Sequence, residues 1–147
     1  MRVIYSLFII ALFLTTPVPT AQAAPSHMDG PVTAKVIEVI DGDTLRVRVT
    51  VWLGQSLETL VRIKGIDTPE KRSQCDHEKQ QADKARQRLS SLIGDQDIVL
   101  YDIHAGKYAG RVLAAVRTLN GQDIAENMLA AGLARPYHGK KRQSWCS

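Results

Sequence analysis

The sequence has little cysteine, few aromatic residues and no strong excess of either charge. Among its 147 residues, 2 are Cys, 5% are aromatic, and 19 Lys and Arg are balanced against 15 Asp and Glu, a formal net charge of +4. Two cysteines are too few for a disulfide-dense miniprotein, and 10 glycines are too few for a collagen-like repeat. Because 44% of the residues are apolar and 23% are charged, the chain can bury a core. With these classes excluded, the composition predicts one ordinary globular domain.

The sequence also lacks an apolar run long enough for a membrane-spanning helix. Its longest run, residues 3–14, is interrupted by Ser6, whereas a spanning helix needs roughly 18 or more apolar residues. This run follows Arg2 and precedes the Ala-Gln-Ala-Ala sequence of residues 21–24, which has the Ala-x-Ala form of a secretory cleavage site. We therefore predict a signal peptide over residues 1–23. The mature protein is expected to be secreted or periplasmic, without stable membrane association.

An oxidising compartment changes the interpretation of the two cysteines. Cys75 and Cys146 allow one intramolecular pairing, so a disulfide is favoured over two buried thiols. A structural zinc site at Cys75 and His77 is not predicted, because such a site needs four ligands and no further ligand motif follows. The four histidines share no spacing and are expected to be surface residues: His27, His77, His104 and His138.

Alternating apolar residues predict three strands in the first half of the domain. A polar, turn-rich leader over residues 24–30 is expected to be flexible, and the domain is expected over residues 31–147. The first strand covers residues 32–40, where the apolar positions change phase and indicate a bulge before an Asp-Gly turn. Residues 45–51 alternate as in a half-buried antiparallel strand, and a third strand follows over residues 57–66.

The second half combines helical and strand patterns. Apolar residues at three- and four-residue spacing predict an amphipathic helix over residues 77–93, with Asp76 as its cap. Two short strands are expected over residues 98–103 and 111–118. Asp123, with a glutamate three residues later, then predicts the start of a short second helix.

This order of elements predicts a mainly β fold of the α+β class. Three strands, a helix, two strands and a second helix have the layout of a five-stranded OB-fold Greek-key barrel with two helices. A short basic C-terminal tail follows the second helix. Other small β-barrels fit the same pattern, so the strand order alone does not select the OB fold.

Two acidic segments suggest a site for a hard cation. The Asp-Gly-Asp-Thr sequence of residues 41–44 lies at a hairpin turn, and the strand that carries Arg62 ends in the Asp-Thr-Pro-Glu sequence of residues 67–70. The plainer interpretation is an ordinary turn and an exposed strand end with an ion pair. Calcium, however, needs several oxygen ligands from different segments, and carboxylates of Asp43 and Asp67 with backbone carbonyls and water would supply them.

Two basic segments contain tyrosine. These are the Lys-Tyr-Ala-Gly-Arg sequence of residues 107–111 and the stretch of residues 135–142, which includes Tyr137. A charge run is usually a solvated face, but basic residues interleaved with tyrosine also suit a phosphate chain whose bases stack. Together with the acidic segments, they supply what phosphodiester cleavage requires: a metal, arginines for the phosphate oxygens and a carboxylate to direct water.

Four motifs occur in an order and spacing that resemble the staphylococcal nuclease (thermonuclease) family. They are Asp-Gly-Asp-Thr at residues 41–44, Arg62 with Ile-Asp-Thr-Pro-Glu at residues 66–70, Gly-Arg-Val-Leu-Ala at residues 110–114, and Asn-Met-Leu-Ala-Ala-Gly-Leu-Ala at residues 127–134. The resemblance covers roughly residues 31–137, nearly all of the mature chain.

The resemblance implies a calcium-dependent OB-fold nuclease that cuts DNA and RNA and leaves 3′-phosphates. Little base specificity is expected because contacts through phosphate carry no sequence information. The residues that match the family's site are the catalytic Arg62, Glu70 and Arg111, the metal ligands Asp43, Asp67 and the Thr68 carbonyl, and the substrate-binding Lys107 and Tyr108. Tyr137, a further substrate-binding candidate, lies near the family's base-stacking tyrosines without a direct match to one of them. In this correspondence the glutamate is the general base or positions water, and the two arginines neutralise the phosphate in the transition state.

The sequence departs from the family pattern at one position, and two other functions are also weighed. Ala109 separates Lys107-Tyr108 from Gly110-Arg111, where the family usually reads Lys-Tyr-Gly-Arg, and we align the chain on Arg111. The main alternative function is a nucleic-acid-binding OB-fold module without catalysis, and the other is a secreted β-barrel with neither property. The substrate partners expected are DNA and RNA, and a monomer is expected.

Overall fold

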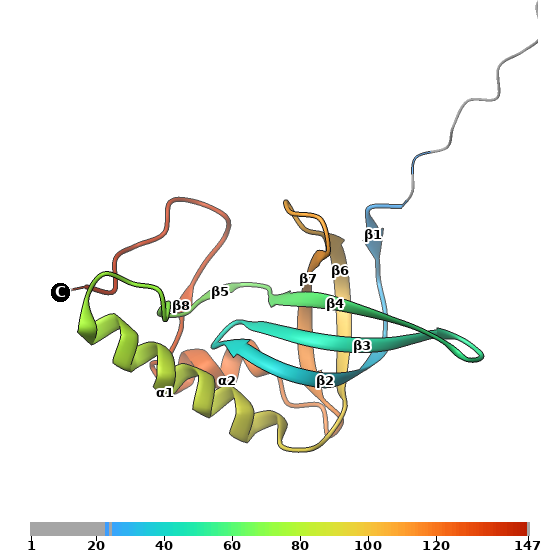
Figure 1. The fold of residues 1–147 in the computed structure, drawn as a ribbon, viewed down its shortest axis with the longest axis horizontal. Helices are drawn as coiled ribbons and strands as arrows, with labels where there is room; N and C mark the ends of the chain where they lie inside the picture. Colours follow the sequence, from blue (N-terminus) through green and yellow to red (C-terminus); the bar gives the residue numbers. More distant parts are fainter. Residues whose placement is uncertain (1–22, 24, 147) are drawn as a thin grey trace, which may run out of the picture.

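The computed structural model describes residue 23 and residues 25–146, which form a β-barrel with two helices (Figure 1). The predicted signal peptide lies outside the described residues except for Ala23. In chain order, the elements are β1 (His27–Met28), β2 (Val32–Asp41), β3 (Thr44–Trp52), β4 (Gln55–Ile63), β5 (Ile66–Asp67), α1 (Asp76–Ile93), β6 (Ile98–Ala105), β7 (Arg111–Thr118), α2 (Ile124–Ala130) and β8 (Arg135–Pro136).

Five of the strands close the barrel. β2, β3 and β4 form an antiparallel meander, and β4 then pairs in parallel with β7. β7 pairs antiparallel with β6, and β6 returns to pair with β2, so no barrel edge is left open. This closed mixed barrel with two helices confirms the predicted OB-fold class. The predicted bulge in the first strand is also present, as register shifts in the pairing of β2 with β3.

Alternating side chains of the strands and one face of each helix form a single core. Leu45 and Val47 of β3 and Val61 and Ile63 of β4 are at most 1% exposed. The helices add Ala85, Leu89 and Ile93 from α1 and Ile124 and Met128 from α2. α1 packs against β2 and α2, and thus covers one end of the barrel (Figure 1).

Two local predictions are wrong and one is confirmed. The third predicted strand is broken, because Gly65 adopts φ +81° in a turn and the chain leaves the barrel as β5, which pairs with β8. α1 begins after Cys75, so Asp76 lies in the first turn instead of at the cap, where its charge still favours the helix N-terminus. The cap of α2 is as predicted, since the Asp123 side chain accepts the backbone N–H of Glu126.

A disulfide joins Cys75 to Cys146 and confirms the predicted pairing. Because Cys75 directly precedes α1, the bond holds the tail that follows β8 beside the start of this helix (Figure 1). Because the disulfide holds it there, the tail is part of the folded domain, and its side chains can contribute to a site.

None of the helices in the described part of the chain is long and apolar enough to cross a membrane.

Removing this disulfide is expected to destabilise the protein. The cysteines are 71 positions apart, so the closed loop has 71 + 1 = 72 residues, for which the chain-entropy model gives about 4 kcal/mol as an upper value. Urea unfolding of a Cys75→Ser, Cys146→Ser double variant measures the loss in the free energy of unfolding. Reduced wild-type protein serves as the control and should unfold like the variant. Equal stability of oxidised wild type and variant would contradict this account.

Candidate active site

A polar pocket of about 170 Å³ lies where the β2–β3 turn, β4, the segment after β5 and the start of β7 meet. Its lining residues are Ile40, Asp41, Asp43, Thr44, Leu60, Arg62, Thr68, Glu70 and Arg111. Five of the residues predicted for the site are therefore brought together here, from segments that span most of the domain: Asp43, Arg62, Thr68, Glu70 and Arg111.

Close packing of the β2–β3 turn holds Asp43 in this pocket. A Cβ atom on Gly42 would lie 2.6 Å from the Cβ of Ala85 and 3.0 Å from Oγ1 of Thr68, so only glycine fits at this turn. Asp43 is 4% exposed. Its Oδ1 accepts the hydroxyl of Thr44 at 2.9 Å, and its Oδ2 accepts the backbone N–H of Thr68 at 3.1 Å. These contacts fix the orientation of the carboxylate.

Arg62 lies between two buried carboxylates. Its Nη1 is 2.6 Å from Oδ1 of Asp43, and its Nη2 is 3.5 Å from Oδ1 of Asp67. Asp67 lies on β5 and is 6% exposed. The guanidinium carbon also lies 5.9 Å from the centre of the Tyr137 ring. One guanidinium thus offsets the charge of both predicted metal-ligating carboxylates, as buried acidic groups require.

Arg142 of the C-terminal tail contacts the same acidic cluster. Its Nε donates to both oxygens of Asp67, at 2.9 and 3.1 Å, and its Nη2 donates to the Thr68 carbonyl at 2.7 Å and to Oε1 of Glu78 at 2.9 Å. Its Nη1 lies 3.3 Å from Oε1 of Glu70. This planar, forked arrangement suits arginine and no other side chain.

The role of the tail was missed by reasoning from the sequence, which assigned the basic stretch of residues 135–142 to phosphate. Trp145 adds a further contact, as its indole N–H donates to Oδ2 of Asp67 at 3.1 Å. Arg135 covers the Trp145 ring at 3.7 Å. The signal that could have indicated this arrangement is the disulfide, because pairing Cys146 with Cys75 brings the tail to the start of α1 and its neighbouring acidic residues.

Hydrogen bonds in this cluster shift the pKa values of two groups. Burial would raise the pKa of Glu78, but hydrogen bonds from the Ser73 hydroxyl, the Glu70 backbone N–H and Arg142 together hold it below its usual range. Burial would lower the pKa of Arg142, and the carboxylates around it raise this pKa instead. Both groups therefore remain ionised in the folded protein.

Two other residues complete the pocket. Burial, followed by the nearby charge of Asp43, raises the pKa of Asp41 above its usual range. Arg111 begins β7 opposite Leu60 of β4, and its buried Nε has no hydrogen-bond partner among the described residues. The same is true of the Oγ1 atom of Thr68. Polar atoms without partners in a pocket are suited to contact a bound ligand.

The loop between β6 and β7 accommodates the extra Ala109. Gly110 adopts φ +75°, and the N–H of Arg111 donates to the carbonyl of Tyr108 at 3.3 Å, so the added residue is taken up in a turn. Arg111 thus reaches the pocket, whereas Lys107 and Tyr108 do not line it. They remain beside it, because the guanidinium carbon of Arg111 lies 5.6 Å from the centre of the Tyr108 ring.

Tyr137 lies in a second, basic pocket of about 260 Å³. This pocket is lined by Asp67, Arg135, Pro136, Tyr137, His138, Lys140, Lys141 and Gln143. Because Tyr137 also contacts Arg62, the basic pocket adjoins the carboxylate cluster. The structure therefore brings Tyr137 close to the other predicted site residues, whereas Lys107 and Tyr108 line neither of these two pockets.

The donor chemistry of the carboxylate cluster fits a hard cation such as calcium. Two carboxylates, those of Asp43 and Asp67, and the Thr68 carbonyl offer only oxygen ligands. In this structure Arg62 contacts the first carboxylate, and Arg142 contacts the second and the carbonyl. Across residues 25–146, neither aspartate belongs to a group of three His, Cys, Asp or Glu ligand atoms within 4.8 Å of one another. The Asp67 carboxylate and the Thr68 carbonyl are thus engaged by Arg142 in this structure.

The barrel with its two helices and its pocket of carboxylates and arginines defines a small OB-fold protein with a polar, charged candidate site. The model for the staphylococcal nuclease homologue family matches residues 60–145, a range that includes Arg62, Asp67, Arg111 and Arg142. The chain belongs to this family, as its four motifs predicted, and thus to a family of nucleases whose substrate is nucleic acid. A search of curated proteins found no match to the chain.

Proposed function

We propose that this protein is a secreted or periplasmic calcium-dependent nuclease. It hydrolyses phosphodiester bonds of DNA and RNA and leaves 3′-phosphate products. The observation that carries this proposal is the position of Arg62 between the carboxylates of Asp43 and Asp67, in a pocket that Glu70 and Arg111 also line. A protein that only bound nucleic acid would gain nothing from paired carboxylates, because they repel phosphate.

Three residues of the pocket act on the substrate or on water in the proposed reaction. Arg62 and Arg111 hold the non-bridging phosphate oxygens, and their guanidinium groups stabilise the negative charge that develops in the transition state. Glu70 accepts a proton from the attacking water or orients it. The Glu70 side chain is 58% exposed, so water reaches it without a change in the fold.

Calcium would be held by Asp43, Asp67 and the Thr68 carbonyl. When bound, the ion supplies Lewis-acid stabilisation of a phosphate oxygen. Arg142 stands in for that positive charge in the folded protein without metal, because it contacts Asp67 and the Thr68 carbonyl. Its side chain then has to turn away, toward the nucleic acid or the solvent, when the ion binds.

The basic surface supports nucleic acid as the substrate. Lys107 and Tyr108 border the pocket through Arg111, and Tyr137 lies with Lys140 and Lys141 in the adjoining basic pocket. Cations bind the phosphate chain, and tyrosines stack on exposed bases. Contacts to phosphate carry no sequence information, so little base specificity is expected.

Secretion is supported by two independent features of the chain. Residues 1–23 have the composition of a signal peptide, and the Cys75–Cys146 disulfide is of the kind that persists outside the cytoplasm.

A specific observation favours a second candidate function, a nucleic-acid-binding module without catalysis. Both oxygens of Asp67 and the Thr68 carbonyl are already occupied by Arg142, so the metal ligands are not free.

Chelation distinguishes the two functions. The mature protein, residues 24–147, should cut single-stranded DNA, double-stranded DNA and RNA in calcium, lose this activity in excess chelator and regain it when calcium is restored. The far-UV circular dichroism should not change, because Arg62 and Arg142 continue to compensate the carboxylates. Gel analysis and end-group analysis of the products measure cleavage and the 3′-phosphate.

Nucleic acid incubated in the same calcium buffer without protein is the control for spontaneous strand breakage. Salt-dependent binding of nucleic acid without cleavage in calcium would support the non-catalytic module. Undiminished cleavage in chelator, with bound metal excluded by elemental analysis, would overturn the metal assignment and with it the roles given to Asp43 and Asp67.

A further inference from the structure

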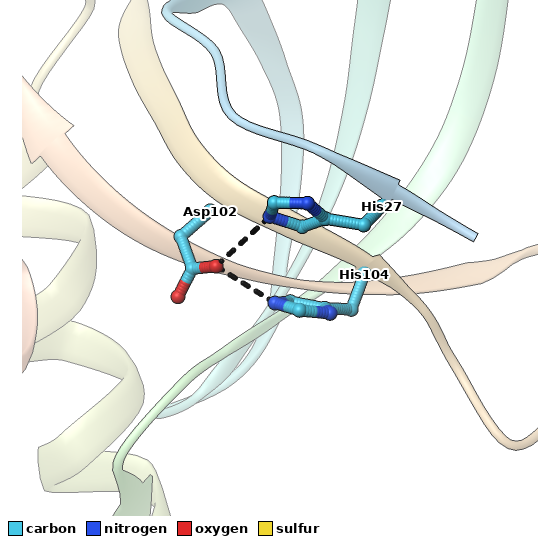
Figure 2. Close-up of side chains that lie close together, drawn as sticks. All are labelled: His27, Asp102 and His104. Atoms are coloured by element: carbon cyan, nitrogen blue, oxygen red, sulfur yellow. Dashed lines mark hydrogen bonds and ion pairs between the residues drawn. The ribbon is translucent and has the colours of Figure 1, made fainter. Parts of the chain in front are cut away.

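Three side chains on the surface of the barrel converge around one carboxylate oxygen (Figure 2). His27 lies in β1, whereas Asp102 and His104 lie in β6. The pairing of β1 with β6 places His27 directly opposite His104. Both histidines are surface residues, as predicted, but the sequence showed no shared spacing because 75 positions separate His27 from Asp102.

The geometry of this cluster is that of a ligand set. The Nε2 atoms of His27 and His104 lie 3.2 and 2.7 Å from the same Oδ1 atom of Asp102. Figure 2 shows both rings on one side of the carboxylate, and their centroids are 4.4 Å apart. Neighbouring ligand atoms around a tetrahedral zinc ion, with metal–ligand bonds of about 2.0 Å, are about 3.3 Å apart. The His27 separation of 3.2 Å matches that spacing, whereas the His104 separation of 2.7 Å is that of a direct hydrogen bond, which an ion between the two atoms would widen.

The backbone of β6 is adapted to this arrangement. Asp102 adopts φ +48°, the left-handed region that non-glycine residues seldom occupy, at a register shift in the pairing of β6 with β7. Its N–H donates to the carbonyl of Asp29 at 2.8 Å, which ties the bend to the segment that carries His27. Backbone strain of this kind gathers at functional positions.

Lys64 leaves one oxygen of Asp102 available. Its Nζ contacts Oδ2 at 2.5 Å, so Oδ1 is the oxygen that faces the two imidazoles. A charged contact of this type, made from outside the ligand set, orients a metal-ligating carboxylate.

We propose that His27, Asp102 and His104 bind a divalent transition-metal ion of the zinc class at the junction of β1 and β6. Two imidazole nitrogens and one carboxylate oxygen suit zinc, cobalt or nickel, whereas calcium takes oxygen ligands. Oδ1 of Asp29, 3.5 Å from Nε2 of His27, or a water molecule completes the coordination. None of these residues lines the pocket that contains Arg62, so this site is separate from the proposed catalytic one.

The ion would fasten the N-terminal segment to the barrel. β1 has only two residues, and apart from its pairing the segment is held by backbone hydrogen bonds from Asp102 to Asp29 and from Ala105 to Ser26. A metal that links His27 to Asp102 and His104 adds a strong, non-local tie between them. The proposal does not depend on nuclease activity, because its residues take no part in the proposed reaction.

Zinc titration of the mature protein tests this site. Calorimetry in saturating calcium, which occupies the carboxylate cluster, should show one zinc ion per chain. His27→Ala and His104→Ala should each weaken zinc binding by more than the roughly 10–100-fold that loss of a residue hydrogen-bonded to a metal ligand costs. His77→Ala and His138→Ala, which alter the two other exposed histidines, are matched controls and should bind zinc like the wild type.

Amide hydrogen exchange gives an independent readout. Zinc should slow the exchange of the Asp102 and Ala105 N–H groups in the wild type and should not slow it in His27→Ala. Because His27 lies in an exposed two-residue strand, this variant is expected to fold even if His104→Ala does not. The proposal is overturned if the wild type binds no zinc in calcium, or if His27→Ala binds zinc as tightly as the wild type.

Discussion

Replacement of Glu70 by glutamine is expected to lower the turnover of nucleic-acid cleavage by about 10²–10⁴-fold, the usual contribution of a general base. The amide has the size of the carboxylate but cannot accept a proton from water. It also keeps an oxygen that can accept from Arg142, whose Nη1 lies 3.3 Å from the carboxylate. The change should therefore act on turnover and leave substrate affinity and the fold nearly intact. Single-turnover cleavage and equilibrium binding in calcium separate the two effects.

Glu126→Gln is the matched control for this variant. Glu126 is an exposed residue of α2 and does not line the pocket, so the same chemical change there should leave turnover unchanged. If Glu70→Gln cuts DNA at the wild-type rate, Glu70 is not the base. A parallel rise in the dissociation constant would instead assign Glu70 to substrate binding.

Replacement of Arg142 by alanine is expected to lower the free energy of unfolding by about 3 kcal/mol, the low end of what loss of one partner of a buried ion pair costs. Asp67 and Glu78, whose side chains are 8% and 6% exposed, would lose their main cation. Urea unfolding without metal measures this effect. Arg48→Ala is the matched control, because Arg48 and Glu58 form an exposed ion pair worth at most about 1 kcal/mol.

The same variant tests the competition between Arg142 and calcium. Without Arg142, the Asp67 carboxylate and the Thr68 carbonyl are free to bind the ion, so calorimetry should show tighter calcium binding than in the wild type. Calcium should also restore part of the lost stability by mass action. Weaker calcium binding in Arg142→Ala would show that this arginine supports the metal site instead of occupying it.

Stability of the wild type at low pH should follow the ionisation of Glu78. A carboxyl group whose pKa is lowered on folding contributes stability that is fully present above its ordinary pKa and is lost as the pH falls through the lowered value. Since Arg142 is one cause of this shift, Arg142→Ala should lose less stability over this acid range than the wild type does. An identical pH dependence in both proteins would contradict the assignment.

Much of the fold could be predicted because its signals are local. Strict alternation of apolar residues identified β3, helical spacing identified α1 to within one residue, and the bounds of β7, Arg111–Thr118, were predicted correctly. Asp123 capped α2 as expected. The residues of the pocket could be predicted from motif spacing, because turns and strand ends place Asp43, Thr68 and Glu70 at one rim of a small barrel.

Other features depend on contacts between residues far apart in the chain, and no local pattern encodes them. The parallel pairing of β4 with β7 closes the barrel, and the turn at Gly65 sends β5 out of it to pair with β8. Arg142 meets Asp67 across 75 positions, as His27 meets Asp102 across 75. Periodicity reports which face of an element is buried, whereas the partner of a charged side chain follows only from how the packed elements bring surfaces together.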